Sequence, residues 1–354
     1  MSSLYKYISL AFFGMIASNF LMPKTHFPSN LVDPKRELVK QVETDSIQYE
    51  LWLLYDNNDQ PDQFMAEIFT PVCYSNKCYP VYIDFYWDLL GNYQYYKVPK
   101  GERLTKNDHE PFNKDDYEHL QRILQNESSL LGEYAAEDLV SSTESESPTG
   151  VDAVTGATSK TIQNEVISGA VYSCYTLWHI AHGEINESIL SHTESIYKED
   201  DIVRFLESEN HKYQYWALDK VFKGDLLDKE KYASPVLNIL RGKNIFISQY
   251  LVEKLPIEMF TGKERQQWLW ETYLISPYRL QLSLLDKMKL IELEREVELL
   301  LIGQLENSNK IQKEKILAIL NEQKLADEAK SALSALLEKN EDNEKILEIL
   351  NNQK

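Results

Sequence analysis

The second half of the chain carries an internal repeat, and this repeat constrains the fold more than any other feature. Five short segments recur at steps of 34, 34, 31 and 32 residues, beginning at Leu206, Leu240, Leu274, Leu305 and Leu337. Each segment is followed by an apolar stretch with helical spacing, such as KIQKEKILAIL or EDNEKILEIL. A unit of this size cannot bury its apolar face alone and must stack on its neighbours. The repeat therefore predicts a second half built entirely from stacked helices.

This pattern resembles short HEAT-like helical repeats over roughly residues 190–354. The resemblance is one of spacing and carries no diagnostic motif. It implies an all-α HEAT-like solenoid, to which we assign residues 186–354. An irregular helical bundle is the alternative fold for the same residues.

Length and charge exclude several classes of protein. The 354 residues are enough for two domains, and the apolar content of 43% is typical of a folded, soluble chain. Asp and Glu number 56 against 37 Lys and Arg, which gives a net charge of −19. Because so acidic a surface repels phosphate backbones, we expect no nucleic-acid partner.

The first 20 residues have the layout of a secretory signal peptide. Lys6 precedes an apolar run from Ile8 to Ala17, and small residues follow the run. The run is shorter than the roughly 20 residues that a membrane span needs. We therefore expect an exported protein, periplasmic or membrane-associated on the extracytoplasmic side. A buried N-terminal helix is the alternative.

An α+β domain is predicted between the leader and the helical repeats. Residues 21–63 read as an N-terminal extension, and residues 64–185 as the domain itself. Phe64 to Val98 is rich in β-branched and aromatic residues, which predicts two or three strands with a hairpin near Gly91. Helical spacing predicts one helix over 115–124 and another from about Lys160 to His182.

The segment Asp152-Ala-Val-Thr-Gly-Ala-Thr158 carries the strongest chemical signal. Gly156 and Ala157 leave little bulk over the backbone, so that a phosphate group can approach closely. A helix that begins near Lys160 would point its free N–H groups at Thr158, and the lysine would balance a phosphodiester. A threonine hydroxyl is a poor nucleophile, so its modification would need an external enzyme. The alternative is an ordinary Gly/Ser/Thr turn with a helix N-cap.

The same segment resembles the flavinylation motif D-x-x-(S/T)-G-A-T of FMN-binding domains in NqrC/RnfG-like membrane-associated subunits and related exported flavoproteins. The resemblance covers roughly residues 64–183, and only the seven-residue motif is specific. It implies FMN attached through its phosphate to the Thr158 hydroxyl by a flavin transferase, in a domain with a mixed sheet and flanking helices. The cofactor-binding residues that it implies are Asp152, Thr155, Gly156, Ala157, Thr158, Ser159 and Lys160. Lys160 stands where the family usually has a threonine, and Thr161 follows it.

Aromatic residues and cysteines supply further candidates. Flavin rings need flat partners, and several aromatic side chains of the predicted hairpin and helix could serve: Tyr86, Trp87, Tyr93, Tyr95, Tyr96, Tyr175 and Trp178. The alternative for each is an ordinary place in the core.

Cys73 and Cys78 are expected to form a structural disulfide in the oxidising extracytoplasmic space, although a dithiol that exchanges electrons with a flavin is the other reading. Cys174 lies on the apolar helix face and is expected to be a buried thiol.

Together these features predict an exported flavoprotein that carries FMN for extracytoplasmic electron transfer. It would be a redox carrier or oxidoreductase subunit rather than a stand-alone enzyme, and its helical domain would dock a redox partner protein or membrane complex. Two alternatives remain open. One is a non-enzymatic scaffold whose flavin-type domain is structural, and the other is a flavin reductase with noncovalently bound FMN.

Overall fold

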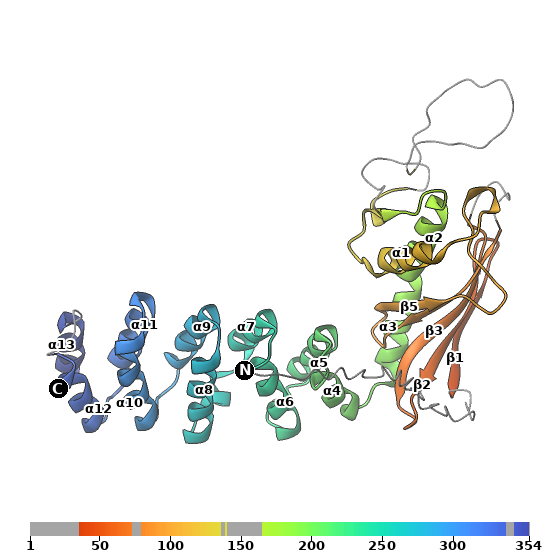
Figure 1. Ribbon diagram of the computed structural model, residues 1–354. Helices are drawn as coiled ribbons and strands as arrows, with labels where there is room; N and C mark the ends of the chain where they lie inside the picture. Colours follow the sequence, from red (N-terminus) through yellow and green to blue (C-terminus); the bar gives the residue numbers. More distant parts are fainter. Residues whose placement is uncertain (1–34, 73–78, 136–138, 140–164, 338–342, 354) are drawn as a thin grey trace, which may run out of the picture. The chain divides into compact units, whose positions relative to one another are not determined.

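The computed structural model describes residues 35–72, 79–135, 139, 165–337 and 343–353 (Figure 1). The chain divides into two compact units. The first, which we call the sheet unit, comprises residues 1–88 and 93–177, and the second, the helical unit, comprises residues 89–92 and 178–354. An α+β arrangement followed by an all-α one is therefore confirmed at the level of fold class.

The sheet unit contains a five-stranded antiparallel meander. Its strands are β1 (Arg36–Glu43), β2 (Gln48–Tyr55), β3 (Pro61–Thr70), β4 (Val81–Trp87) and β5 (Tyr93–Lys97), in the order β1-β2-β3-β4-β5. The predicted hairpin near Gly91 is present, and this glycine has a φ of +81°, which other residues rarely adopt. Two expectations differ from the structure. The described strands pair only antiparallel, so the sheet is not mixed, and β1 and β2 come from residues expected to form a separate extension.

Alternate residues of each strand point to opposite faces of the sheet. The inner face holds the core of this unit: Leu51, Leu53, Phe64, Ala66, Ile83, Phe85 and Trp87, all fully buried. Helix α1 (Lys114–Gln125) packs beside β5, where the Tyr93 hydroxyl donates to Gln121 at 2.9 Å. A capping box between Asn113 and Asp116 stabilises the start of this helix. The helix predicted over 115–124 is confirmed. Two short 3₁₀ turns, Asn107–His109 and Leu130–Gly132, flank it.

Helix α2 (Val171–Ala181) begins later than the sequence predicted. Among the described residues before it, 166–170 form a bend and a turn and not a helix. Gly169 has a φ of +79°, a left-handed conformation that cannot continue an α-helix. The expected helix from Lys160 is therefore wrong over 166–170, and the free N–H groups at the start of α2 lie thirteen residues beyond Thr158 in sequence.

Among the described residues, the helical unit contains the last turn of α2, then α3 (Glu184–Ile196) and five helix pairs. The pairs are α4 (Glu199–Leu206) with α5 (His211–Lys223), α6 (Glu230–Leu240) with α7 (Ile245–Lys254), α8 (Lys263–Ile275) with α9 (Tyr278–Met288), α10 (Arg295–Gln304) with α11 (Lys310–Glu322), and α12 (Asp327–Ala335) with α13 (Asn343–Asn352). Short 3₁₀ turns at Ile257–Phe260 and Leu305–Asn307 complete it. Alternate helices contact each other, α4 with α6 and α10 with α12 in one row, α7 with α9, α9 with α11 and α11 with α13 in the other (Figure 1).

The sequence repeat corresponds to the turn inside each helix pair. Leu206 and Leu240 end α4 and α6, and Leu305 directly follows α10. An asparagine then caps the second helix of three pairs, since the side chains of Asn210, Asn244 and Asn309 each accept a backbone N–H of the following turn. The repeated segment therefore specifies where one helix stops and the next one starts.

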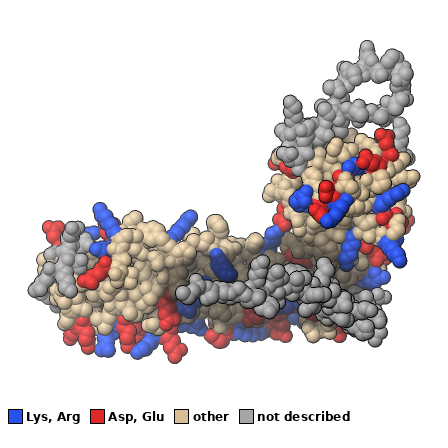
Figure 2. All heavy atoms as spheres, in the orientation of Figure 1, with Lys and Arg blue, Asp and Glu red and all other residues tan. Residues whose placement is uncertain are grey.

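Charged residues link successive pairs along one edge of the helical unit. Lys231 pairs with Glu199, Arg265 with Glu230 at 3.0 Å, Lys263 with Glu296 at 2.6 Å, and Arg295 with Glu328 at 3.2 Å. Figure 2 shows acidic and basic side chains interspersed along the lower edge of this unit. Because these side chains are exposed to solvent, each pair contributes little to stability. They favour the correct alignment of neighbouring pairs more than they add stability.

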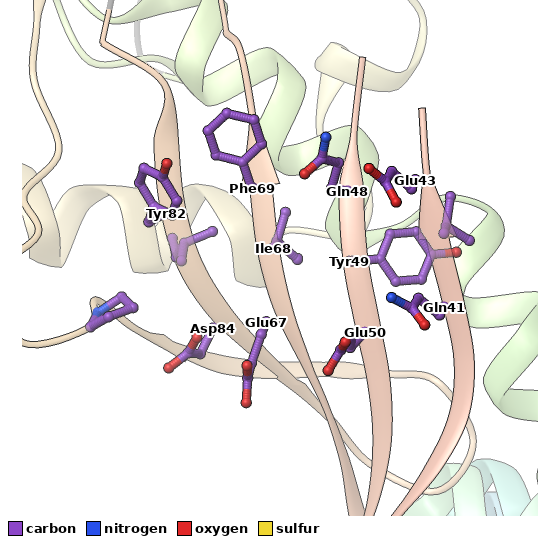
Figure 3. Close-up of a pocket in the computed structure, with 13 residues that line it drawn as sticks. Gln41, Glu43, Gln48, Tyr49, Glu50, Glu67, Ile68, Phe69, Tyr82 and Asp84 are labelled. Atoms are coloured by element: carbon purple, nitrogen blue, oxygen red, sulfur yellow. The ribbon is translucent and has the colours of Figure 1, made fainter. Parts of the chain in front are cut away.

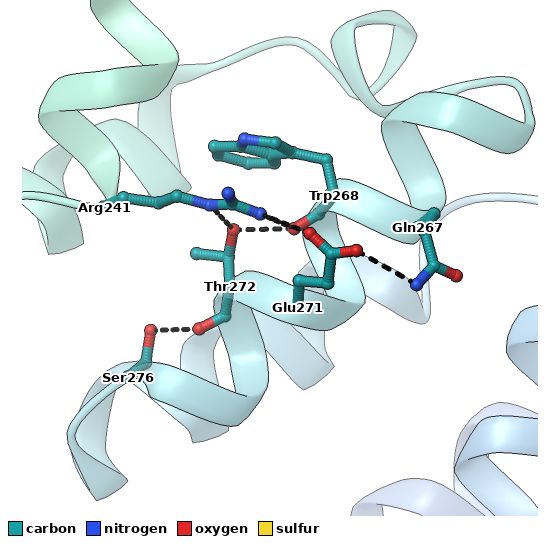
Figure 4. Close-up of polar contacts among 6 residues, drawn as sticks. All are labelled: Arg241, Gln267, Trp268, Glu271, Thr272 and Ser276. Atoms are coloured by element: carbon teal, nitrogen blue, oxygen red, sulfur yellow. Dashed lines mark hydrogen bonds and ion pairs between the residues drawn. The ribbon is translucent and has the colours of Figure 1, made fainter.

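Arg241 connects two successive pairs more firmly (Figure 4). From the end of α6, its guanidinium donates to the Thr272 hydroxyl at 2.6 Å and to the Trp268 carbonyl at 2.7 Å, both on α8. The same group lies 4.3 Å from the centre of the Trp268 ring and 3.4 Å from Glu271. This planar set of donors suits arginine and would not be reproduced by lysine.

Candidate functional site

The implied cofactor site lies outside the described residues. This holds for Asp152 and for the run Thr155, Gly156, Ala157, Thr158, Ser159 and Lys160. Cys73 and Cys78, the pair expected to form a disulfide, also lie outside them. The structure therefore provides the surroundings of the motif in the chain, and no geometry of the motif itself.

Glu165 joins the two described ends of the stretch that carries the motif. Its carboxylate accepts the Leu130 N–H at 2.9 Å, and the Ser129 hydroxyl donates to the same carboxylate oxygen. Leu131 and Val166, the neighbours of these groups in sequence, are buried. Glu165 thus connects the segment that precedes the motif with the segment that follows it, beside buried residues.

A second set of contacts holds the approach to α2. The Asn107 N–H donates to the Gly169 carbonyl at 2.7 Å, and Lys106 forms an ion pair with Asp116 at 2.9 Å. Burial acts to raise the pKa of Asp116, but the N–H of Asn113 and the Lys106 ammonium outweigh it and hold that pKa below its ordinary value. Asp116 is therefore ionised at neutral pH and keeps this segment anchored to the start of α1.

The aromatic residues proposed to flank a flavin do not form one group. Tyr86 and Tyr95 stack at 4.4 Å on the outer face of the sheet, opposite the face that forms the core. Trp87 and Tyr96 point to the inner face, where the Tyr96 hydroxyl donates to the Tyr117 carbonyl at 2.9 Å. Trp178 belongs to the helical unit. The candidates on β4 and β5 therefore lie on both faces of the sheet, because neighbouring residues of a strand face opposite ways, and their part in flanking a flavin stays a prediction.

The outer face of the sheet contains a hollow that the sequence did not reveal. It has a volume of about 380 Å³ and lies over β1 to β4 (Figure 3). Three carboxylates, those of Glu50, Glu67 and Asp84, stand on neighbouring strands in direct cross-strand register. Burial raises the pKa of Asp84, Glu67 raises it further, and Lys97 partly offsets both. These residues are far apart in sequence, and only the strand register brings them into one row.

Histidines and acids build no metal site in the described part of the chain. No group of three His, Cys, Asp or Glu side chains there is placed to hold a metal ion. His179 lies in the last turn of α2, and the His182 ring is 4.7 Å from that of Trp178. In the same residues, no helix is both long enough and apolar enough to cross a membrane.

Comparisons with known proteins found no match. Neither a family model, nor a curated protein, nor a solved structure matches this chain.

Cys174 is fully buried on α2, as expected, and this burial raises the pKa of its thiol to about 12. Its sulfur accepts the Ile167 N–H at 3.3 Å. Because only the thiolate reacts rapidly, we expect Cys174 to resist a thiol reagent such as DTNB at pH 8 in the folded protein and to react after unfolding. The measurement is best made in a variant with Cys73→Ser and Cys78→Ser. Stoichiometric labelling of the folded variant within seconds would contradict the prediction.

Proposed function

We propose that this protein is an exported flavoprotein that carries FMN, attached through its phosphate to the Thr158 hydroxyl, for extracytoplasmic electron transfer. The observation that carries the proposal is the sequence DAVTGAT at residues 152–158. Its position supports the proposal, since Glu165 holds the flanks of this stretch together at Ser129 and Leu130. This contact would keep a group attached at Thr158 close to the part of the sheet unit that contains Ser129 and Leu130.

Each residue of the motif would have a defined part in holding FMN. The Thr158 hydroxyl would form the phosphodiester, and Gly156 and Ala157 would leave room for the phosphate beside the backbone. The Lys160 ammonium would offset the remaining negative charge. The described helix α2 starts only at Val171, so the proposal does not depend on a helix dipole at Thr158. When bound, FMN supplies the electron-transfer chemistry, and the protein supplies position and electrostatics.

We further propose that the helix pairs of the helical unit are HEAT-like repeats that dock a redox partner. Support comes from the two rows of contacting helices and from the recurrence of the pair at about one repeat length. Large apolar side chains are exposed on these helices, among them Phe246 and Leu347. Single exposed apolar side chains are common on folded proteins, so the proposal of a docking surface depends on the repeated helix pair.

The proposal is tested by the mass of the denatured protein. The full chain, with its leader, is co-expressed with a flavin transferase of the NqrC/RnfG type and examined for intact mass and for flavin fluorescence after denaturation. We expect a mass increase of one FMN less one water, together with fluorescence that stays with the unfolded chain. Thr158→Ala should lose both signals completely.

A matched control separates the tether from its neighbours. Thr161→Ala removes a hydroxyl three residues further on, and it should leave the modification intact. Unmodified wild-type protein, or equal labelling of the Thr158→Ala variant, would overturn the proposal. Flavin that binds the native protein but dissociates on denaturation would instead identify a noncovalent flavoprotein such as a flavin reductase.

A non-enzymatic scaffold is the second candidate. The separation of the aromatic residues by the sheet favours it, because the described residues provide no single stacking surface made from Tyr86, Trp87 and Tyr96. In this case the helical unit would bind its partner equally well with and without the Thr158 hydroxyl. Comparing partner binding by wild type and Thr158→Ala distinguishes the two candidates once a partner is known.

A further inference from the structure

The outer face of the sheet presents three rows of side chains that run across the strands. The middle row is acidic and consists of Glu50, Glu67 and Asp84 on β2, β3 and β4. One flanking row, two residues along each strand, is apolar and consists of Trp52, Met65 and Tyr86. On the other side of the acidic row lie Gln48, Phe69 and Tyr82, whose two rings are 4.8 Å apart.

The acidic row is unfavourable for the isolated sheet. Like charges directly opposite each other on neighbouring strands repel, at a cost of some tenths of a kcal/mol to about 1 kcal/mol per pair. Among the described residues, Glu67 has an ion-pair partner in Arg36 at 2.9 Å, and Lys97 is the cation that acts on Asp84. Three carboxylates thus share two nearby cations, which leaves an excess of negative charge at the centre of this face.

Two basic side chains of the protein already show how a cation fits this face. The Arg36 guanidinium pairs with Glu67 while lying 4.3 Å from the centre of the Trp52 ring. The Lys97 ammonium lies 4.8 Å from the centre of the Tyr86 ring. In both cases a cation rests on an aromatic ring of the outer face, beside the acidic row. Such contacts contribute about 0.5–1 kcal/mol each at exposed sites.

The outer face remains accessible at its centre and along one flank. Glu67 and Tyr82 are both close to half exposed, at 48% and 44%. The buried apolar cluster on this face, formed by Leu54, Met65 and Tyr86, packs against Trp52 and Tyr95 of the same sheet. Among the described residues, Glu67 and Tyr82 are therefore the side chains of the acidic row and of its flank that a partner can reach.

We propose that this outer face docks an extended, basic segment of a partner protein. Side chains on one side of an extended chain recur every two residues, about 6.5–7 Å apart, which is also the distance between the rows of the sheet. A segment that contains the pattern basic-x-aromatic can therefore place its basic group over the carboxylates and its aromatic group on the accessible flank formed by Phe69 and Tyr82. This matching spacing favours a polypeptide over a small polyamine, which has no apolar groups to offer. The inference does not depend on a flavin at Thr158.

The test uses a labelled peptide of matched spacing with the full-length protein. The probe is fluorescein-labelled Leu-Thr-Lys-Thr-Phe, and its binding is followed by fluorescence anisotropy at low and at physiological salt. We expect saturable binding that weakens with salt, and no binding of the counterpart with Glu in place of Lys. The double variant Glu50→Gln/Asp84→Asn should bind about tenfold more weakly or worse, the factor expected from losing one charge-assisted hydrogen bond.

A control variant separates this surface from the general acidity of the chain. Glu102→Gln/Glu110→Gln removes the same two charges from exposed positions elsewhere on the sheet unit and should bind as wild type does. Far-UV circular dichroism checks that both variants are folded. Equal weakening in the two double variants would reduce the effect to non-specific attraction and overturn the proposal, as would a failure of the lysine peptide to bind. Equal binding of spermidine and the peptide, both lost in Glu50→Gln/Asp84→Asn, would identify a polyamine site instead.

Discussion

Replacing Leu317 by alanine should destabilise the helical unit by about 2–5 kcal/mol, whereas the same change at Leu347 should cost less than about 0.5 kcal/mol. Both leucines stand at the same place in a repeated sequence, KILAIL at 315–320 and KILEIL at 345–350. Leu317 is only 3% exposed on α11, a helix that contacts both α9 and α13, whereas Leu347 on α13 is 48% exposed. Alanine at position 317 therefore leaves a cavity in the core. Alanine at position 347 shortens a side chain that is half exposed and leaves no cavity.

Urea unfolding of the two variants measures the difference in their free energies of unfolding. Hydrogen exchange of peptides from α11 and α13 then shows where protection is lost. The comparison is well matched because helix propensity and neighbouring residues are almost the same at the two positions. Similar losses of stability in both variants would show that α13 is covered on its Leu347 side in solution. Little effect in either variant would mean that α11 and α13 do not pack as the structure has them.

Trp87→Ala should destabilise the sheet unit by about 3–5 kcal/mol, the usual cost of removing a large buried aromatic side chain. Trp87 is fully buried on the inner face, 5.7 Å from the Phe85 ring. Tyr82 lies on the same strand but points to the outer face and is 44% exposed. Tyr82→Ala is therefore the control, and its effect should stay below about 1 kcal/mol.

Hydrogen exchange of peptides from β3 to β5 reports on this unit separately from the helices. Trp87→Ala should raise hydrogen exchange in all three strands, because paired strands open together as one cooperative unit. Normal protection in this variant would place Trp87 outside the core. An equal effect of Tyr82→Ala would mean that the outer face is itself packed against another surface.

Local patterns in the sequence were sufficient for several elements of the fold. A run rich in β-branched and aromatic residues, divided by a turn near Gly91, predicted the hairpin, since strand propensity and turn glycines act over a few residues. The helix at 115–124 was predicted equally well, and Asn113 provides its cap. The repeated segments at Leu206, Leu240 and Leu305 predicted that a helix follows each of them, and the start of such a helix depends on nearby capping residues.

Other features depended on contacts between distant segments. The helix expected from Lys160 was predicted from apolar spacing alone, and that spacing gives no sign that Gly169 adopts a positive φ while its carbonyl is bound to Asn107. The extension expected at 21–63 contains β1 and β2, whose partners are set by the register of the whole sheet.

The sequence by itself determined the class of each half of the chain and the chemistry proposed for Thr158, because helical period, turn residues and a short motif are all local. Only the tertiary structure decided which side chains share a surface. It separated Tyr86 from Trp87, aligned Glu50, Glu67 and Asp84 across three strands, and buried Leu317 while leaving Leu347 exposed. The physical reason is that burial and register depend on which segments pack together, and this packing is a property of the whole fold.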